Sequence, residues 1–422
     1  MHGMRKLYRM MQAAAMAQAR WELEVSQTIL HSRKRMIVLM LVSLPALLFA
    51  IAFAADSLPA VLGGKHAYSP AFYDTNVFLV SIAIGLCAGL ITGCIGAGGG
   101  FIIAPALMSA GIKGILAVGT DLFHIFAKAI MGTAVHKKLG NISVGLAVWF
   151  LVGSLLGVTG GGVINRTLYE INPILSDTFI SMVYVFLLGF LGVYALTDFI
   201  RLSKAGGTVD AHGGGSGGDP SKKGLPARLQ SVSIPPFITF DEDLVPGGKR
   251  ISALFVVLCG GFVGFVAAIM GVGGGFLTFP MFVYVLGVSS FTTVGTDILQ
   301  IIFTAGYASI TQYATYGFIF YTLAMGMLLG SLFGIQVGAL TTRVIKGIYI
   351  RGFYATAIMA GFINRLFALP SKLESMKWIS LDPGTGKMLA TVGNWAFFIV
   401  VACFAGWVLS MFLRNIKQLR EA

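Results

Sequence analysis

The sequence is poor in charged residues. Asp, Glu, Lys and Arg make up 11% of its 422 residues, whereas hydrophobic residues make up 56%. Soluble domains carry charge on roughly a quarter of their residues, so this composition excludes an ordinary soluble protein and favours one that a bilayer surrounds. Several stretches without Asp, Glu, Lys, Arg or His are long enough to cross the hydrocarbon core, which takes about 20 residues. These stretches are 36–55, 77–112, 139–165, 178–197, 251–296, 298–342 and 388–413.

Cysteine is also scarce, and the usual catalytic motifs are missing. No CxxC or Cys/His spacing occurs, which argues against a disulfide framework and against a metal site. The chain contains no HExxH motif and no Walker loop, so we expect no enzyme, no cofactor and no metal. An intramembrane hydrolase stays as a minor alternative, because serine and histidine occur within the apolar stretches. The cysteines all lie inside such stretches, at Cys87, Cys94, Cys259 and Cys403.

Positive charge outnumbers negative charge, and the net charge is +13. Such an excess can indicate a nucleic-acid partner. Here Lys and Arg gather in the loops that the predicted topology places on the cytoplasmic side, as the positive-inside rule requires. We therefore expect the lipid bilayer, and no nucleic acid, as the partner of this chain.

Terminal segments and a linker surround two apolar regions. Residues 1–36 are basic and predict a cytoplasmic segment, and 37–55 predict a first transmembrane helix that is kept rather than cleaved as a signal peptide. Residues 201–250 contain a Gly/Ser-rich run that predicts a flexible linker. The SVSIPPFITF that follows this run is either an ordered extended segment or more linker. A last transmembrane helix is predicted over 390–413.

The two apolar regions, 77–200 and 251–370, repeat one another. The first contains GCIGAGGGFIIAP followed by VGTD, and the second contains AIMGVGGGFLTFP followed by VGTD. Chance does not produce this much ordered matching, so we predict two transmembrane repeats. The matched residues of the first repeat are Gly96, Gly98, Gly99, Gly100, Phe101, Thr120 and Asp121, and those of the second are Gly271, Gly273, Gly274, Gly275, Phe276, Thr296 and Asp297.

Each repeat predicts five apolar elements, of which the first two meet at the glycine run without a polar turn. We interpret these two as a glycine-broken, re-entrant-like hairpin, which returns the chain to the side that it entered. Three spanning helices follow, so each repeat has odd parity and the second is inverted. The elements are 77–95, 100–112, 115–136, 143–165 and 178–200, then 251–270, 276–288, 295–313, 318–341 and 352–370.

The predicted fold class is therefore an all-α polytopic membrane protein. It has two inverted-topology repeats, each with a glycine-broken hairpin plus three spanning helices, and an extra helix at each end. The positive-inside rule agrees if both termini are cytoplasmic, and loop 371–389, with charges of both signs, is the weakest point. Loop 166–177 falls on the outside.

Inverted repeats with broken helices are typical of alternating-access transporters. Helices that begin at Phe101 and Phe276 offer unpaired N–H groups and positive dipole ends within the membrane. The glycines before them leave these amides bare, so that an anion can touch them. The pattern predicts a substrate site between two half-helix N-termini, and close helix packing is the alternative explanation for the glycines.

Ionisable residues within segment 115–136 extend this site. Asp121, His124 and Lys128 share one helical stripe. A charge at the centre of a bilayer costs about 2.5–3.5 kcal/mol even on lenient scales, so such residues usually face partners or a pathway. Lys128 is the predicted anion contact, with an ion pair to Asp121 as the equal alternative. His124 is a candidate for coupling, and a hydrogen-bonded core histidine is the alternative.

Two further sets of residues have open alternatives. Asp121 and Asp297, each preceded by a threonine, either line the substrate site or cap the helices that we expect them to begin. Arg365 is a candidate for coupling or for a second anion contact, with an interfacial anchor as the alternative.

The paired motifs GCIGAGGGFIIAP and IMGVGGGFLTFP, each followed by VGTD, resemble the TauE/SafE sulfite exporter family over roughly 77–370. The resemblance implies a secondary transporter, and more specifically an exporter, in a prokaryotic inner membrane. Its expected partner is sulfite or a related small sulfur-containing anion, such as thiosulfate or the organosulfonate sulfoacetate. Transport is then linked to protons or driven electrochemically. A passive anion channel is the alternative, and a homodimer is left open.

Overall fold

The computed structural model divides the chain into two compact units, Met1–Pro59 and Ala60–Ala422. The predicted segment 1–36, the predicted helix 37–55, residues 206–224 of the linker, and Gly96, Gly98 and Gly99 lie outside the described residues. The structure describes residues 75–95, 100–139, 143–205, 225–241, 248–341, 345 and 347–415.

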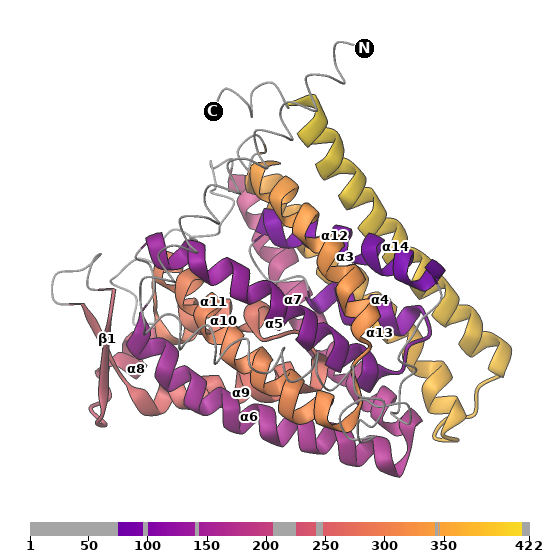
Figure 1. The fold of residues 1–422 in the computed structure, drawn as a ribbon, viewed down its shortest axis with the longest axis horizontal. Coiled ribbons are helices and arrows are strands. Elements are labelled where there is room, and N and C mark those ends of the chain that lie inside the picture. The colour runs from indigo at the N-terminus through magenta and orange to yellow at the C-terminus, as the bar shows by residue number, and fades with distance from the viewer. Residues whose placement is uncertain are drawn as a thin grey trace, which may run out of the picture. The chain divides into compact units, whose positions relative to one another are not determined.

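Helices dominate the described part of the chain (Figure 1). Six of them, α6, α7, α9, α12, α13 and α14, are long and apolar enough to cross a membrane by length and composition. This confirms the predicted all-α polytopic membrane fold. The first repeat contains α3 (Thr75–Ile95), α4 (Gly100–Ser109), α5 (Gly114–Leu139), α6 (Val144–Ile171) and α7 (Pro173–Ala205).

The second repeat has the same order of elements, with less regular helices. Its second and third elements contain π-helical turns, which commonly mark functional positions within helices. Its elements are α9 (Ala253–Met270), α10 (Gly275–Pro280), the π-helix η2 (Met281–Leu286), α11 (Ser290–Tyr307), the π-helix η3 (Ala308–Tyr313), the 3₁₀ turn η4 (Ala314–Tyr316), α12 (Tyr321–Thr341) and α13 (Gly347–Ser375). The last helix is α14 (Pro383–Arg414).

The helices extend further than the charge pattern predicted. Asn172 alone separates α6 from α7, so the predicted loop 166–177 is largely helical. The Asn172 side chain accepts the N–H of Ile174 at 2.8 Å, and Pro173 is tolerated at the first position of a helix, where no intrahelical donor is required. Loop 371–389 is likewise largely helical, because α13 ends at Ser375 and α14 begins at Pro383.

Two helix pairs, α3 with α12 and α6 with α9, pack backbone against backbone (Figure 1). Glycines make this close approach possible, as is common between membrane helices. Replacing each residue of the first pair by its counterpart in the other repeat gives the contacts of the second pair. The facing residues are Gly85 with Met327 and Gly89 with Ser331 in the first pair, and Gly260 with Phe150 and Gly264 with Ser154 in the second.

The third and fifth elements of each repeat contact their own counterparts in the other repeat. Residue numbers rise along one partner as they fall along the other, so both pairs are antiparallel. The contacts are Gly119 with Tyr313 and Phe126 with Gly306 where α5 meets α11 and η3, and Gly189 with Phe362 and Phe199 with Gly352 where α7 meets α13.

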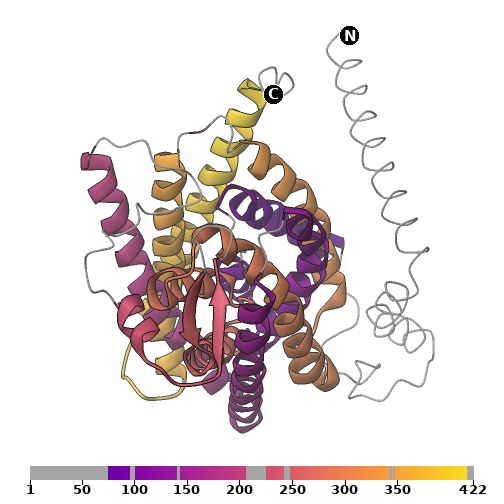
Figure 2. The same ribbon diagram turned by 90° about the vertical axis from the view of Figure 1, so that its left-hand side faces the viewer.

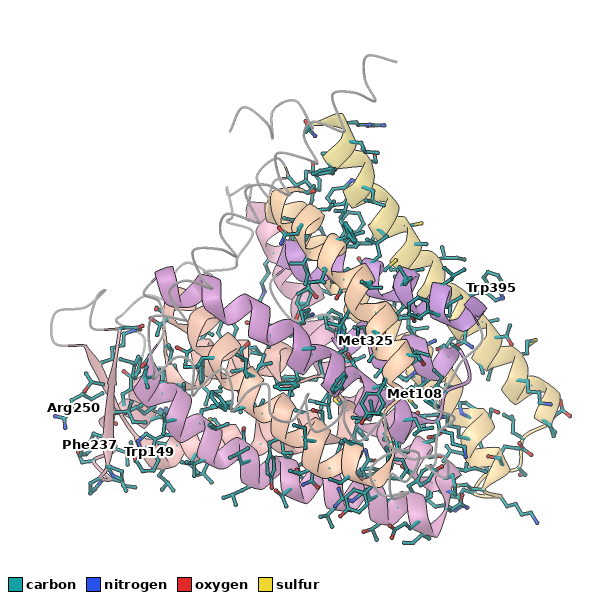
Figure 3. All side chains as sticks on the ribbon, in the orientation of Figure 1. Met108, Trp149, Phe237, Arg250, Met325 and Trp395 are labelled. Atoms are coloured by element: carbon teal, nitrogen blue, oxygen red, sulfur yellow. The ribbon has the colours of Figure 1, made fainter. Side chains whose placement is uncertain are left out.

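The end of the linker is ordered. It contains α8 (Leu225–Ser231) and two strands, β1 (Phe237–Phe240) and β2 (Lys249–Ser252), which form an antiparallel hairpin (Figure 2). The Arg250 guanidinium lies 4.8 Å from the centre of the Phe237 ring, on the outer side of this hairpin (Figure 3). Part of the SVSIPPFITF stretch is therefore an extended strand and not plain linker.

This linker end holds the turn between η2 and α11. Gln230 Nε2 donates to the carbonyl of Leu286 at 2.9 Å, and Lys249 Nζ donates to the carbonyl of Gly287 at 3.0 Å. Asp241 accepts the N–H and the hydroxyl of Ser289 at 2.9 and 2.7 Å. Ser289 is the residue that caps α11, because its side chain accepts the N–H of Thr292 at 3.2 Å. The Asp241 carboxylate thereby holds the capping residue in place.

Candidate functional site

The two repeats meet at their glycine breaks. Gly100 begins α4, and a Cβ atom built on it would lie 3.0 Å from the Cα atom of Val272, in the second glycine run. The same Cβ atom would lie 3.0 Å from Ile125 of α5. Val272 is buried. The start of α4, the second glycine run and α5 therefore form one close contact in the interior.

The second glycine run is built from left-handed residues. Gly271, Gly273 and Gly274 have φ angles of 78°, 66° and 88°, which glycine alone adopts without strain. The N–H groups of Leu277 and Thr278 both return to the carbonyl of Gly274. This leaves the amides of residues 272–276 without an intrahelical acceptor. The helix after the break begins at Gly275, one residue before the predicted Phe276, and continues from α10 into η2.

Three buried side chains from other elements satisfy the carbonyl end of α9. A helix that ends within a bilayer must find protein partners for its last carbonyls, and here Tyr and Asn side chains supply them. Sequence reasoning missed these residues. The available signal was their polarity within stretches otherwise free of charge. The side chains of Tyr184, Asn165 and Tyr313 donate to the backbone carbonyls of Met270 (2.5 Å), Ile269 (3.4 Å) and Ala268, respectively.

The polar stripe of α5 faces this junction. Val118 lies against Gly271 and Ile125 lies against Gly273. Asp121 lies three positions after Val118 and four positions before Ile125, so these three side chains share one face of α5. Asp121 is completely buried, and its electrostatic neighbours are Lys128 on the same helix and Tyr184 on α7. The structure therefore brings Asp121 to the helix face that packs against the second glycine run.

Asp121 and His124 lack hydrogen bonds that their burial demands. Both carboxylate oxygens of Asp121 and Nδ1 of His124 are buried without a hydrogen-bond partner. Asp121 Oδ1 lies 3.5 Å from His124 Nδ1, whereas His124 Nε2 lies 3.0 Å from Ser331 Oγ of α12. A buried polar group without a partner costs about 1–3 kcal/mol, and most folded proteins avoid it.

Lys128 does not form the direct ion pair with Asp121 that was the alternative to an anion contact. Within the described residues, no salt bridge of 4.0 Å or less joins them. The Lys128 Nζ atom instead lies 3.5 Å from Thr92 Oγ1 of α3. The ammonium group therefore points toward α3.

The equivalent stripe of α11 is a closed chain of hydrogen bonds. Gln300 Nε2 donates to Asp297 Oδ1 at 2.8 Å, and Thr304 Oγ1 donates to Gln300 Oε1 at 2.8 Å. The Thr304 hydroxyl also lies 2.6 Å from the hydroxyl of Ser154 on α6. The Gln300 amide thus gives the Asp297 carboxylate a permanent hydrogen-bond donor, which the Asp121 carboxylate lacks.

The two VGTD motifs do not cap the helices that carry them, so this part of the prediction is wrong. Helices α5 and α11 begin at Gly114 and Ser290, well before Thr120, Asp121, Thr296 and Asp297. Each threonine instead accepts an N–H just before the fourth helix of the other repeat. These bonds are Phe320 N–H to Thr120 Oγ1 and Ser143 N–H to Thr296 Oγ1, both at 3.0 Å.

Arg365 binds the carbonyl end of α4 and lies away from the glycine breaks. Its guanidinium donates to Ser109 Oγ at 2.7 Å, to the carbonyl of Pro105 at 3.3 Å and to Asn364 Oδ1 at 2.7 Å. A cation at this end of a helix complements the helix dipole. Arg365 is only 2% exposed, so the alternative of an interfacial anchor is wrong. Its role in coupling stays a prediction.

Comparison with known proteins places this site within one matched region. A family model described as sulfite exporter TauE/SafE matches residues 81–365, which include both glycine runs and both polar stripes. The chain is 25% identical over 263 residues to the probable membrane transporter protein YjnA of Bacillus subtilis (strain 168), across 61% of this chain and 87% of that protein.

A second relative from the same organism is similarly distant. The chain is 24% identical over 274 residues to the probable membrane transporter protein YunE, across 63% of this chain and 89% of that protein. No solved structure matches the chain.

Proposed function

This chain belongs to the sulfite exporter TauE/SafE family, and from this premise we propose that it exports sulfite or a related sulfur-containing anion by secondary transport. Its relatives are described as membrane transporters, and its six apolar helices make it a multi-pass membrane protein. The proposed location is a prokaryotic inner membrane, with both termini in the cytoplasm. A proton gradient or the electrochemical gradient of the anion supplies the driving force.

The proposed mechanism is alternating access between two inverted repeats. The contacts of the structure support it, because exchanging the repeats converts the α3–α12 pair into the α9–α6 pair. The elements that contact their own counterparts are antiparallel, which is the relation expected for a two-fold axis in the membrane plane. Motion of one set of helices against the other around such an axis exposes a central site to each side in turn.

The contact between Gly100 and Val272 carries the proposal for the substrate site. It brings the first half-helix against the second glycine run, whose amides at 272–276 lack intrahelical acceptors. Backbone amides in such a run are suited to an oxyanion. A tetrahedral or pyramidal sulfur oxyanion presents several acceptor oxygens, and sulfonates present three. The proposed anion therefore lies between the two breaks and accepts hydrogen bonds from the backbone.

Lys128 is the proposed cationic contact of the anion. It lies on the α5 face that carries Asp121, it makes no ion pair of 4.0 Å or less with that carboxylate, and its hydrogen bond to Thr92 is long at 3.5 Å. An ammonium group without a close carboxylate, held inside the protein, favours an anionic ligand.

Flux measurements in proteoliposomes test this function. Purified protein is reconstituted, and the uptake of sulfite, thiosulfate, sulfoacetate and sulfate is measured against concentration and against an imposed pH gradient. The proposal expects saturable flux of at least one of the first three anions, and counterflow when the same anion is loaded inside. Flux that rises linearly without counterflow indicates a passive channel, and absence of flux for all four contradicts the proposal.

A pair of lysine variants sharpens the test. Lys128→Ala is expected to lower saturable flux more than about tenfold, the loss of one charge-assisted contact, and Lys128→Arg is expected to restore part of it. Lys387→Ala, at an exposed lysine near the start of α14, is the matched control and should transport as the unmodified protein does.

A further inference from the structure

We propose that Asp121 and His124 together bind one exchangeable proton, and that this proton favours binding of the anion. The first part stands on the geometry of the two side chains alone. The second part rests on the proposed function. Asp297 and Gln300 occupy the equivalent positions of the second repeat, and they show how a permanent hydrogen-bond donor satisfies the aspartate.

The proposal assigns one tautomer to His124, with the ring hydrogen on Nε2. The Ser331 hydroxyl donates its one hydrogen to the carbonyl of Leu328 at 3.1 Å. In this assignment the Ser331 oxygen accepts from His124 Nε2, which lies 3.0 Å away. In a neutral imidazole with hydrogen on Nε2, the other ring nitrogen carries a lone pair and accepts. Nδ1 of His124 is thus an acceptor.

Two acceptors consequently face each other in the interior. His124 Nδ1 lies 3.5 Å from Asp121 Oδ1, and neither atom has another hydrogen-bond partner. One shared proton removes this conflict. On the carboxyl group, it makes an O–H donor to the imidazole, and on the imidazole it makes an N–H donor to the carboxylate. Either arrangement gives a hydrogen bond that neither unprotonated side chain can supply.

The second repeat places a permanent donor at the equivalent position. Gln300 stands where the first repeat has His124, and its amide N–H donates to Asp297 Oδ1 at 2.8 Å. An amide cannot gain or lose this hydrogen near neutral pH. The comparison assigns the exchangeable proton to the first repeat alone, and it also provides the substitution that should abolish it.

Few charged groups surround the pair. Among the described residues, Lys128 faces it from its own helix, the Tyr184 hydroxyl from α7, the Ser331 hydroxyl from α12 and the backbone of Ala104 from α4. Arg365 lies beyond Tyr184. Metal binding needs several ligands, and the described residues contain no cluster of three His, Cys, Asp or Glu side chains. The chemistry of the pair therefore fits a proton.

The position of Asp121 links the proton to the anion. Asp121 lies on the helix face that packs against the glycine breaks. Without the proton, its negative charge repels an anion bound there, and the repulsion is strong where water is excluded. A proton on the pair removes that repulsion. By linkage, the bound anion must in turn favour uptake of the proton by the same factor.

Difference titration tests the proton site without any anion. The number of protons released by the purified protein between about pH 5 and 8 is compared with that of His124→Gln, which copies the second repeat, and of Asp121→Asn. Each variant is expected to release one proton fewer. The double variant should release no fewer than either single variant, because both changes remove the same proton. Unchanged release, or a loss of two protons in the double variant, overturns the proposal.

Calorimetry with thiosulfate tests the link to the anion. Thiosulfate does not titrate near neutral pH, and titration in two buffers of different ionisation enthalpy counts the protons taken up on binding. The unmodified protein should take up protons, and its affinity should fall by about tenfold per pH unit once the site is empty. His124→Gln should take up none and keep at every pH the weaker affinity that the unmodified protein shows once its site is empty, because Asp121 stays charged.

The outcomes separate the two proposals. Binding of thiosulfate without proton uptake by the unmodified protein contradicts the link to the anion. If the unmodified protein binds none of the sulfur-containing anions, the proposed function fails, and the difference titration still decides the proton site. Proton uptake that persists in His124→Gln shows that another group carries the proton and overturns the assignment.

Discussion

The two repeats share one architecture and differ in what their third helix carries. Both contain VGTD, and both threonines bind the start of the fourth helix of the other repeat at 3.0 Å. After the aspartate, the first repeat continues with His124 and Lys128, whereas the second has Gln300 and Thr304. The second stripe is hydrogen-bonded throughout, and the first contains unpaired buried atoms. The two repeats thus share their framework and the aspartate, whereas the histidine and the lysine that follow it occur in the first repeat alone.

The turns after the two half-helices differ in a second way. Before α5, Asp177 of α7 accepts the N–H of Gly114 at 2.6 Å, so a membrane helix caps the turn. Before α11, Asp241 of the linker accepts the N–H of Ser289. In both places a lysine lies 3.6 Å from the carboxylate, Lys372 in the first case and Lys249 in the second. The end of the linker is thus a structural part of the second repeat.

The largest expected effect is a loss of stability when a glycine in either of the two closely packed helix pairs is replaced by alanine. Gly89→Ala and Gly264→Ala each place a Cβ atom against the backbone of a facing serine, Ser331 or Ser154. Forcing the two helices apart should cost about 3 kcal/mol of the free energy of unfolding in either repeat. Thermal unfolding in detergent measures it, and Gly406→Ala, with open space around it, is the control. Tolerance of one substitution and not the other would break the equivalence.

A smaller effect is expected when Asp177 or Asp241 is replaced, and each replacement should affect one repeat only. Asp241→Ala should cost about 2 kcal/mol, because the N–H and the hydroxyl of Ser289, the residue that caps α11, lose their acceptor. Hydrogen exchange followed by mass spectrometry should show faster exchange around residues 286–292. Asp177→Ala should instead speed exchange around 109–116 and leave the second turn unchanged. Equal changes at both turns in either variant would contradict separate roles for the two aspartates.

The smallest effect belongs to the paired threonines. Thr120→Val and Thr296→Val keep the side-chain shape and remove the acceptor for one backbone N–H. Each should lower the free energy of unfolding by about 1 kcal/mol, and the two values should agree. Thr356→Val, at an exposed threonine that bonds only within its own helix, is the control. A much larger loss of stability in Thr120→Val would show that Thr120 has a role beyond accepting this N–H.

The break before α10 was predictable because the glycine run at 271–275 records it in the sequence. Charge-free stretches gave the membrane class, and parity gave the expected inversion. The partners of individual side chains were not predictable, since they depend on contacts between the repeats. Thr120 binds an amide 200 positions away, and Tyr184 binds the end of α9. The helix starts of α5 and α11 were misplaced because VGTD looks like a cap in isolation, whereas Asp177 accepts the N–H of Gly114 at the start of α5 and Ser289 caps α11.

The charge pattern also misplaced helix ends. Charged residues at 166–177 and 371–389 indicated loops, but a charge near a membrane surface does not interrupt a helix. Arg166 extends from α6 to the backbone carbonyl and side chain of Gln312, at 2.8 and 2.7 Å, and its guanidinium lies 4.1 Å from the Tyr316 ring centre. Such contacts stabilise a helical residue that the sequence pattern places in solvent.

One flux measurement tests most directly whether the first stripe, and not the second, carries transport. Lys128→Thr copies the second repeat into the first, and Thr304→Val alters the same position of the second repeat without adding charge. In proteoliposomes with thiosulfate, the account predicts that saturable flux falls more than about tenfold in Lys128→Thr and less than about threefold in Thr304→Val. Equal flux in the two variants, or a larger loss in Thr304→Val, would contradict it.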